Sequence, residues 1–211
     1  MICVVLHICW RLRLMKDYTF AFQDWAAEGE KGNGFKTFFI DGCFDRFNNL
    51  SKTPLPEHPF STRMTRIEYN QKGKALDRFY LTKSEMKQME AVVERLPDEC
   101  THIVKLTGKY FSEALPKHLA FISQMPNLPI LGLQARGKKY MGWSSELFMM
   151  KRSLMKDVLH RSQWHRTEEW LDNVRKIVQD VGGERLIHFF PMFTLKRVVE
   201  RSGDHTVMSW L

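Results

Sequence analysis

The sequence has no long hydrophobic run. Its most apolar stretch, MICVVLHICW, is soon followed by arginines and is much shorter than the roughly 20 residues that a membrane-spanning helix requires. A secretory signal peptide would place positive charge before the apolar run, and here the order is reversed. We therefore expect no transmembrane span and a core strand at the amino terminus. The alternative is that this stretch is the fragment of a longer membrane anchor.

Cysteine is scarce, and its spacing matches neither a Cys-x-x-Cys pair nor a zinc site with histidine. A chain of 211 residues buries enough apolar surface to fold without disulfide bonds. We therefore expect reduced, mostly buried thiols, which favours a cytoplasmic location. The four cysteines are Cys3, Cys9, Cys43 and Cys100.

Several motifs of common enzyme classes are missing. The sequence contains no H-E-x-x-H, no Walker loop, no G-x-S-x-G elbow and no complete G-x-G-x-x-G. These absences argue against zinc proteases, P-loop NTPases, serine hydrolases and dinucleotide dehydrogenases. Internal repeats and low-complexity segments are missing too, so we expect one globular domain over residues 1–211.

The formal net charge is +8, and the sequence pI is about 9.4. This balance indicates an anionic partner, although a basic solvated surface is the simpler interpretation. Lysines and arginines are spread along the chain rather than gathered in one tract. That distribution favours a compact phosphate-bearing molecule over a long polyanion.

The order of periodic segments predicts a parallel α/β fold. Besides the amino-terminal strand, we expect strands at 34–42, 102–106, 128–135 and 185–191, and helices at 74–96, 152–160 and 167–183. Thr82 and Glu85 have capping-box spacing, and Gly182-Gly183 should end the last helix. Residues 48–62 should form an exposed loop, and 201–206 a polar turn.

The stretch THIVKLTGKYF begins as a buried strand and breaks at a glycine. Ligands of open α/β sheets bind beyond the carboxyl ends of strands, and lysine can meet a phosphate there. A second cationic loop precedes the first long helix, where an anion is also favoured. Glycines and lysines of this kind are common in any α/β protein, which is the competing interpretation. The predicted phosphate-binding residues are Lys72, Gly73, Lys105, Thr107, Gly108, Lys109 and Tyr110.

The succession YNQKGKALDRFYLTKSEMKQMEAVVERLPDECTHIVKLTGKYF resembles the centre of GT-A-type glycosyltransferases. It is most similar to a subgroup in which a strand ends in K-L-T-G-[RK]-Y. WSSELFMMKRS resembles the family's acceptor-contacting stretch, and RTEEWL resembles the helix start that supplies a catalytic carboxylate. The resemblance runs from residue 69 to the end. It implies a three-layer α/β sandwich with a central mixed, mostly parallel sheet.

The same resemblance assigns site residues. Glu169, Glu168 and Glu146 are the candidates for the base that takes the proton of the acceptor hydroxyl. Trp143 and Tyr140 are candidates for stacking on an acceptor sugar, and Glu146 is alternatively an acceptor contact. Arg201 is a candidate for pairing with phosphate, and Asp204 and His205 for contacts with the diphosphate or the acceptor. For each group a purely structural role competes: helix-start preference for the glutamates, core packing for the aromatic residues, and a turn for the last three.

One departure from the family is central. Where the fold commonly carries D-x-D, which holds Mg²⁺ or Mn²⁺, this chain has Thr107-Gly108-Lys109-Tyr110. A fixed cation can neutralise a leaving diphosphate electrostatically, so we expect metal-independent transfer with Lys109 in that role, and Lys105 or Lys72 as further candidates. Asp41 or Asp45 as a displaced metal ligand is the alternative.

Three functions are thus open. The first is sugar transfer from a nucleotide-diphosphate donor to a hydroxyl acceptor. The second is a non-catalytic basic module that binds nucleic acid or nucleotide with Lys, Arg and aromatic side chains, although no recognised nucleic-acid motif supports it. The third is a degenerate transferase fold kept as a scaffold.

Overall fold

The structure is a computed structural model. It describes residues 1–8, 34–41, 65–67, 78–107, 110–111, 114–135, 142–161, 167–191, 195–201 and 204–210. Within these ranges, the side chains of 8, 41, 66, 78–84, 110–111, 161 and 195–210 are not described. The expected loop at 48–62 lies outside the described residues, as do Asp45, Cys9 and Cys43.

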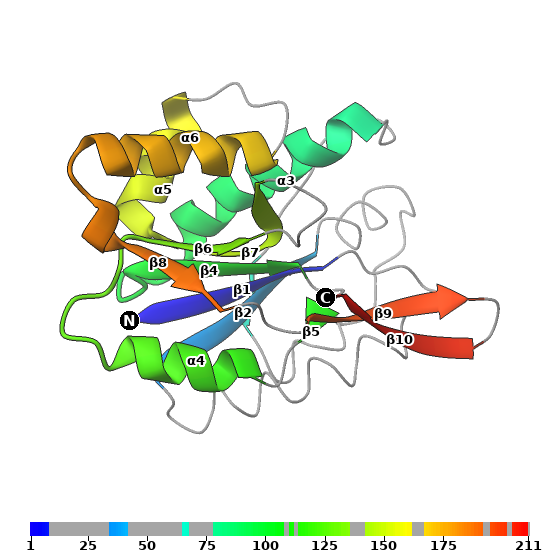
Figure 1. Cartoon of the computed structure of the whole chain (residues 1–211). Coiled ribbons are helices and arrows are strands. Elements are labelled where there is room, and N and C mark those ends of the chain that lie inside the picture. The colour runs from blue at the N-terminus through cyan, green and yellow to red at the C-terminus, as the bar shows by residue number, and fades with distance from the viewer. Residues whose placement is uncertain are drawn as a thin grey trace.

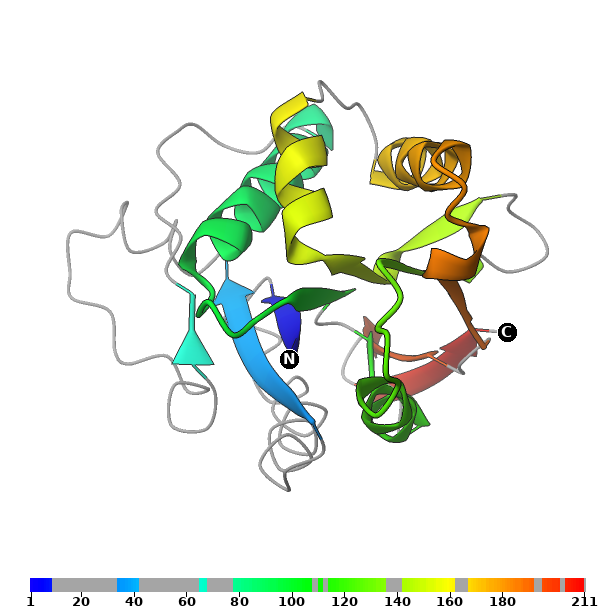
Figure 2. The same ribbon diagram turned by 90° about the vertical axis from the view of Figure 1, so that its left-hand side faces the viewer.

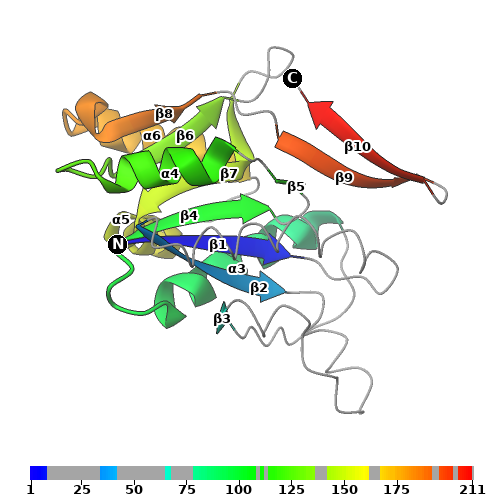
Figure 3. The ribbon, with the colours of Figure 1, turned by 90° about the horizontal axis from the view of Figure 1, so that it is seen from below.

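The centre of the fold is a seven-stranded sheet with the order β3-β2-β1-β4-β7-β6-β8 (Figure 1). β7 is antiparallel to both its neighbours, and the other pairs in this sheet are parallel. The arrows of β1, β2 and β4 run side by side in Figure 3, so their carboxyl ends share one edge. Its strands are β1 (Ile2–Ile8), β2 (Phe35–Asp41), β3 (Thr65–Arg66), β4 (His102–Thr107), β6 (Leu131–Ala135), β7 (Trp143–Lys151) and β8 (Ile187–Phe190).

Helices cover the two faces of this sheet unequally. α3 (Arg78–Arg95), α5 (Arg152–Arg161) and α6 (Thr167–Asp180) lie on one face, and α4 (Ala114–Ser123) lies on the other (Figures 1 and 2). The sheet has a hydrophobic core on each face. Because successive side chains of a strand point to opposite faces, β1 contributes to both: Cys3 and Val5 to the larger core, and Val4 and Leu6 to the smaller. The strands are thus buried on both sides, as expected for a largely parallel sheet.

Most predicted elements are confirmed, with shifted ends. The strand expected at 128–135 begins at Leu131, and the strand expected at 185–191 begins at Ile187 after a short 3-10 turn, η2 (Glu184–Leu186). The predicted capping box is wrong, because α3 already runs from Arg78 and Thr82 lies inside it. The side chain of Glu85 instead leaves the helix to contact two other elements.

The end of α6 matches the prediction from Gly182-Gly183. Gly182 has φ +75°, a left-handed conformation that glycine adopts without a steric penalty. Its N–H donates to the Gln179 carbonyl, and the N–H of Gly183 donates to the Val178 carbonyl. These two bonds form a Schellman motif, which satisfies carbonyl groups that a helix end leaves open.

A smaller sheet extends from the carboxyl edge. It contains β5 (Tyr110–Phe111), β9 (Leu195–Arg201) and β10 (Asp204–Trp210) in the order β10-β9-β5. Asp204 pairs with Arg201 in the antiparallel register of β9 and β10. Most of the segment expected as a turn at 201–206 therefore belongs to two paired strands.

The prediction of reduced thiols is wrong for two of the cysteines. Cys3 and Cys100 form a disulfide bond with their Cα atoms 5.6 Å apart. Both residues are fully buried, which was expected. Parallel pairing of β1 with β4 places Ile2 beside His102, and this register brings the two distant cysteines together. The cysteines therefore no longer favour a reducing compartment.

Among the helices that the structure describes, none is both long and apolar enough to cross a membrane.

Candidate active site

Polar side chains gather where the parallel strands of the large sheet end. His7 near the end of β1 lies beside Thr107 at the end of β4 in the parallel register. The antiparallel β7 begins at this edge, and α6 starts above it (Figure 1). In an open α/β sheet this edge is where ligands bind.

Lys105 is the buried charge of this edge. Its side chain is 1% exposed, and its ammonium forms an ion pair with Glu85 of α3. The same group donates hydrogen bonds to Thr107 Oγ1 (2.9 Å) and to the backbone carbonyl of Ser145. The Phe148 ring lies 6.0 Å from Nζ.

These contacts restrict what Lys105 can do. An ammonium has three N–H donors, and the carboxylate, the hydroxyl and the carbonyl use all three. A direct contact with phosphate therefore stays a prediction, and it requires one partner to be exchanged. The observed arrangement instead makes Lys105 a fixed positive charge that joins β4 to α3 and β7.

His7 was not singled out from the sequence. It is 7% exposed, and its Nδ1 has no hydrogen-bond partner among the described residues. Burial holds the pKa of its imidazole well below the usual range, the nearby Lys105 ammonium lowers that pKa further, and a hydrogen bond with Gln88 opposes both. His7 is therefore neutral at physiological pH. The only sequence signal for it was a polar residue inside an apolar strand.

Gln134 repeats this pattern on another strand. It lies near the end of β6, is 4% exposed, and its Oε1 has no hydrogen-bond partner among the described residues. β6 runs in the same direction as β4, because β7 between them is antiparallel to both. Two buried polar atoms near the carboxyl ends of these strands thus lack a partner among the described residues.

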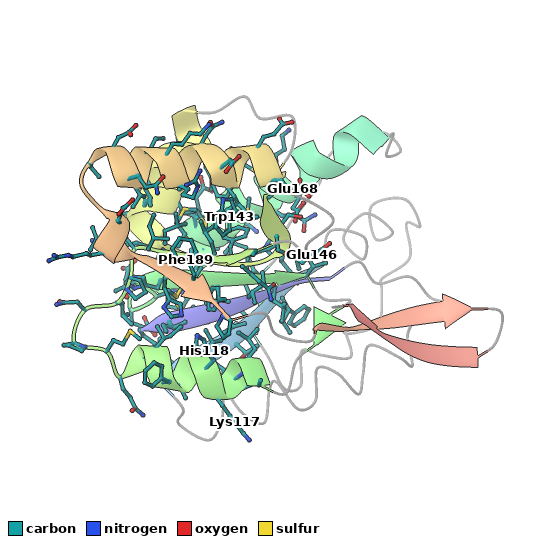
Figure 4. All side chains as sticks on the ribbon, in the orientation of Figure 1. Lys117, His118, Trp143, Glu146, Glu168 and Phe189 are labelled. Carbon is teal, nitrogen blue, oxygen red and sulfur yellow. A yellow bond between two sulfur atoms is a disulfide. The ribbon has the colours of Figure 1, made fainter. Side chains whose placement is uncertain are left out.

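Two of the three predicted glutamates lie at this edge. Figure 4 labels Glu146 on β7 and Glu168 at the first turn of α6. Glu168 Oε1 accepts a hydrogen bond of 3.2 Å from Ser145 Oγ, the residue next to Glu146. The backbone N–H of Glu146 donates to Ser144 Oγ at 3.2 Å. Glu169, the third candidate, is exposed on the same helix turn.

Trp143, the predicted acceptor-binding residue, already has protein partners. Its indole N–H donates to Asp172 Oδ1 at 3.1 Å, and its ring lies 5.7 Å from the Arg175 guanidinium and 5.4 Å from the Phe189 ring. Phe189 is 54% exposed and lies beside Trp143 in Figure 4. Stacking of a sugar on Trp143 stays a prediction, and Phe189 is the more accessible aromatic surface there.

The remaining predicted residues are placed only in part. Lys72, Gly73, Gly108, Lys109 and Tyr140 lie outside the described residues. Tyr110 pairs with Arg197 across β5 and β9. Arg201 is four residues further along β9, about 13 Å at the usual rise of a strand, and Asp204 and His205 lie beside that end on β10. The backbone thus separates these three from Tyr110.

The described residues at this edge do not fit a divalent metal ion. Mg²⁺ and Mn²⁺ prefer several carboxylate or carbonyl oxygens. The segment from Lys105 to Tyr110 has no carboxylate, and Thr107 is bonded to an ammonium. Across the described ranges, no three His, Cys, Asp or Glu side chains form a group that could hold a metal ion. The side chain of Asp41 is not described, so its role as a displaced ligand stays a prediction.

The sequence matches no protein-family model, and the comparison with curated proteins finds no match either. Solved structures do share the fold. A 4-diphosphocytidyl-2C-methyl-D-erythritol synthase from Anaerococcus prevotii is 8% identical, with 90% of this chain and 86% of that chain covered at a TM-score of 0.51. A glycosyltransferase involved in glycosylation of the major capsid of PBCV-1 is 8% identical, with 90% of this chain and 80% of that chain covered at a TM-score of 0.49. The galactosyltransferase LgtC is 10% identical, with 89% of this chain and 72% of that chain covered at a TM-score of 0.46.

At such identities the likeness concerns the fold alone. The sheet order, the helical layers and the neighbours nevertheless confirm the fold class that the sequence predicts. The chain is a layered α/β sandwich with a mixed, mostly parallel sheet, a fold that it shares with the synthase.

Proposed function

We propose that the protein transfers a sugar from a nucleoside-diphosphate donor to a hydroxyl acceptor at the carboxyl edge of the large sheet. The observation that carries this proposal is the position of Glu168, which Ser145 holds at that edge beside the start of β7. A carboxylate that is fixed at a ligand-binding edge can act as a general base.

Each group has a defined part in the proposed reaction. The acceptor oxygen attacks the anomeric carbon and loses its proton to the Glu168 carboxylate. The bond from that carbon to the diphosphate oxygen breaks, and the electron pair leaves with the nucleoside diphosphate. Lys109 neutralises this leaving group in place of a metal ion, while the Lys105 ion pair holds β4 and β7 in position.

The two unpartnered buried atoms support binding of a polar ligand. His7 Nδ1 and Gln134 Oε1 lack partners among the described residues, and burying such atoms without a hydrogen bond costs free energy. A bound nucleotide sugar offers donors and acceptors that can satisfy them. The exposed Phe189 ring, near Trp143, offers an apolar surface to a sugar acceptor.

The test joins nucleotide binding to donor cleavage. We expect at least one of UDP, GDP and dTDP to raise the unfolding temperature, with EDTA present, because a ligand of the native state stabilises it. Lys109→Ala should lower the affinity for that nucleotide about tenfold, which is the effect of losing one charged contact. Release of nucleoside diphosphate from the matching sugar donor should fall by about 10²- to 10⁴-fold in Glu168→Gln.

A matched control is Asp180→Asn, which removes an exposed carboxylate at the other end of α6 and should leave donor cleavage unchanged. If no nucleotide stabilises the protein, the proposal is wrong. If EDTA abolishes activity and Mn²⁺ restores it, only the metal-independent part is wrong. Affinity for nucleic acid that falls steeply with salt, without a preference among mononucleotides, would favour the basic binding module instead.

A further inference from the structure

A pair of histidines lies on the opposite side of the large sheet from Glu168. His118 projects from α4, labelled in Figure 4, and His188 from the edge strand β8. Their Nε2 atoms are 2.9 Å apart although the residues are 70 positions apart in the sequence. The proposed reaction uses neither residue.

We propose that His118 and His188 bind one late first-row transition-metal dication, such as Zn²⁺, Ni²⁺ or Cu²⁺, through their Nε2 atoms. Zn²⁺ binds histidine nitrogen at roughly 2.0–2.1 Å, so two nitrogens on a tetrahedral ion lie roughly 3.4 Å apart. The observed separation of 2.9 Å is a few tenths of an ångström shorter. Small ring movements therefore allow a metal ion to replace the shared proton.

The protonation state of the pair suits a metal ion. Burial lowers the pKa of the His118 imidazole, and burial together with the neighbouring His118 lowers that of His188. Both rings are therefore mainly neutral at physiological pH, the form in which imidazole ligates metals. Both side chains are also partly exposed, so an ion can reach them from solvent.

Packing holds the two rings in place. The Phe190 ring, 4% exposed, lies 5.8 Å from the His118 ring and 5.4 Å from the His188 ring, centroid to centroid. Gly132 is opposite His188 in the β6–β8 register, and a Cβ atom there would lie 2.8 Å from the Phe190 ring. The glycine thus leaves the space that lets Phe190 support both imidazoles. Ligands held before binding lose less conformational entropy when the ion arrives.

The ligand type selects the class of ion. Imidazole suits Zn²⁺, Cu²⁺ and Ni²⁺, whereas Mg²⁺ and Ca²⁺ prefer oxygen. In the part of the chain that the structure describes, no third His, Cys, Asp or Glu completes a larger group around the pair. Water therefore fills the other positions, and we expect an exchangeable ion with micromolar affinity. The ion would link α4 to the edge strand β8.

The test uses tag-free protein that has been treated with EDTA and dialysed. Calorimetric titration with ZnCl₂ should show one equivalent bound, and saturating Zn²⁺ should raise the unfolding temperature by several degrees. MgCl₂ should do neither. His118→Gln and His188→Gln should each lower the affinity for Zn²⁺ at least tenfold. The control is His160→Gln, which removes an exposed histidine on α5 and should leave the affinity unchanged.

A second measurement covers the case in which the variants do not fold. In ¹H–¹⁵N spectra of the wild-type side-chain imidazoles, Zn²⁺ should shift the Nε2 signals of His118 and His188 before those of other histidines. Absence of binding, binding that survives both substitutions, or shifts confined to other histidines would each overturn the site. His118 and His188 would then form only a hydrogen bond with each other.

Discussion

At the scale of single residues, Lys105 is a buried cation whose partners, apart from Thr107, come from outside its local sequence. Glu85 belongs to α3, Ser145 to β7, and Thr167 of α6 donates to the second oxygen of Glu85 at 3.2 Å. A buried ion pair gains little over an apolar pair, but losing one partner leaves an uncompensated charge. The network therefore fixes how four elements, β4, α3, β7 and α6, meet at the candidate site.

A double-mutant cycle tests this network. Glu85→Gln and Lys105→Met should each lower the free energy of unfolding by about 2–4 kcal/mol, at the lower end for Glu85 because its side chain is 30% exposed. The double variant should lose less than the sum of the single losses, with a coupling of about 2 kcal/mol in urea unfolding.

The chain supplies a matched control for that cycle. Lys36 and Glu99 form an ion pair of 3.3 Å with both side chains more than half exposed. Their coupling should be far smaller than that of the Lys105 pair, because solvent screens surface ion pairs. Equal coupling energies in the two cycles would show that burial does not strengthen the Lys105 pair.

The same residues show which features of the site local sequence patterns can predict. The strand through Lys105 was predictable to within one residue of its end, because a largely apolar run stops shortly before a glycine. The role of Glu85 was not, because capping-box spacing describes only local bonds. Its partner lies on a strand that begins 17 positions later, and only the fold brings the two together. His7 was missed for the same reason.

At the scale of elements, Arg152 joins the end of α3 to the start of α5. Its guanidinium donates to the carbonyl oxygens of Val93 (2.9 Å), Leu96 (2.8 Å) and Pro97 (2.8 Å). The last carbonyls of a helix lack partners within the helix, and the helix dipole favours a cation beside them. The arginine in WSSELFMMKRS thus has a structural role: it caps α3.

Arg152→Ala should lower the free energy of unfolding by about 3 kcal/mol, because three carbonyls lose a charged donor. Arg152→Lys should recover only part of that loss, since an ammonium is a point charge without the planar fork of arginine. Lys156→Ala, one turn further along α5 at an exposed position, should change stability by less than about 0.5 kcal/mol. Urea unfolding of the three variants measures these differences, and a loss no larger than that of Lys156→Ala would contradict the cap.

Some helices and strands could be predicted from the sequence and others could not. α6 was predictable because its apolar residues recur at helical spacing and two glycines follow. β7 was not predicted as a strand, because Leu147 to Met150 are buried on both faces and show no alternation. α4 was missed although Leu115, Leu119 and Ile122 have helical spacing, since Pro116 argues against a helix unless it lies in the first turn.

At the scale of the whole molecule, the Cys3–Cys100 disulfide links the starts of the two central parallel strands. It closes a loop with a sequence separation of 97 residues. Nothing in the spacing of the cysteines indicates this bond, because it depends on the register of β1 with β4. In the chain-entropy account, a loop of this length stabilises the folded state by about 4–5 kcal/mol.

Thiol titration tests the bond directly. In a Cys9→Ser/Cys43→Ser background, denatured protein without reductant should show no reactive thiol, and reduction should expose two. Reduction should also lower the midpoint of urea unfolding, and Cys3→Ser/Cys100→Ser should unfold at the lower midpoint whether or not reductant is present. Because the bond acts chiefly by restricting the unfolded chain, the nucleotide affinity of the folded protein should not change. If two free thiols are found before reduction, or if the reductant does not change the urea midpoint of the protein that keeps Cys3 and Cys100, the protein is reduced, as the sequence predicted.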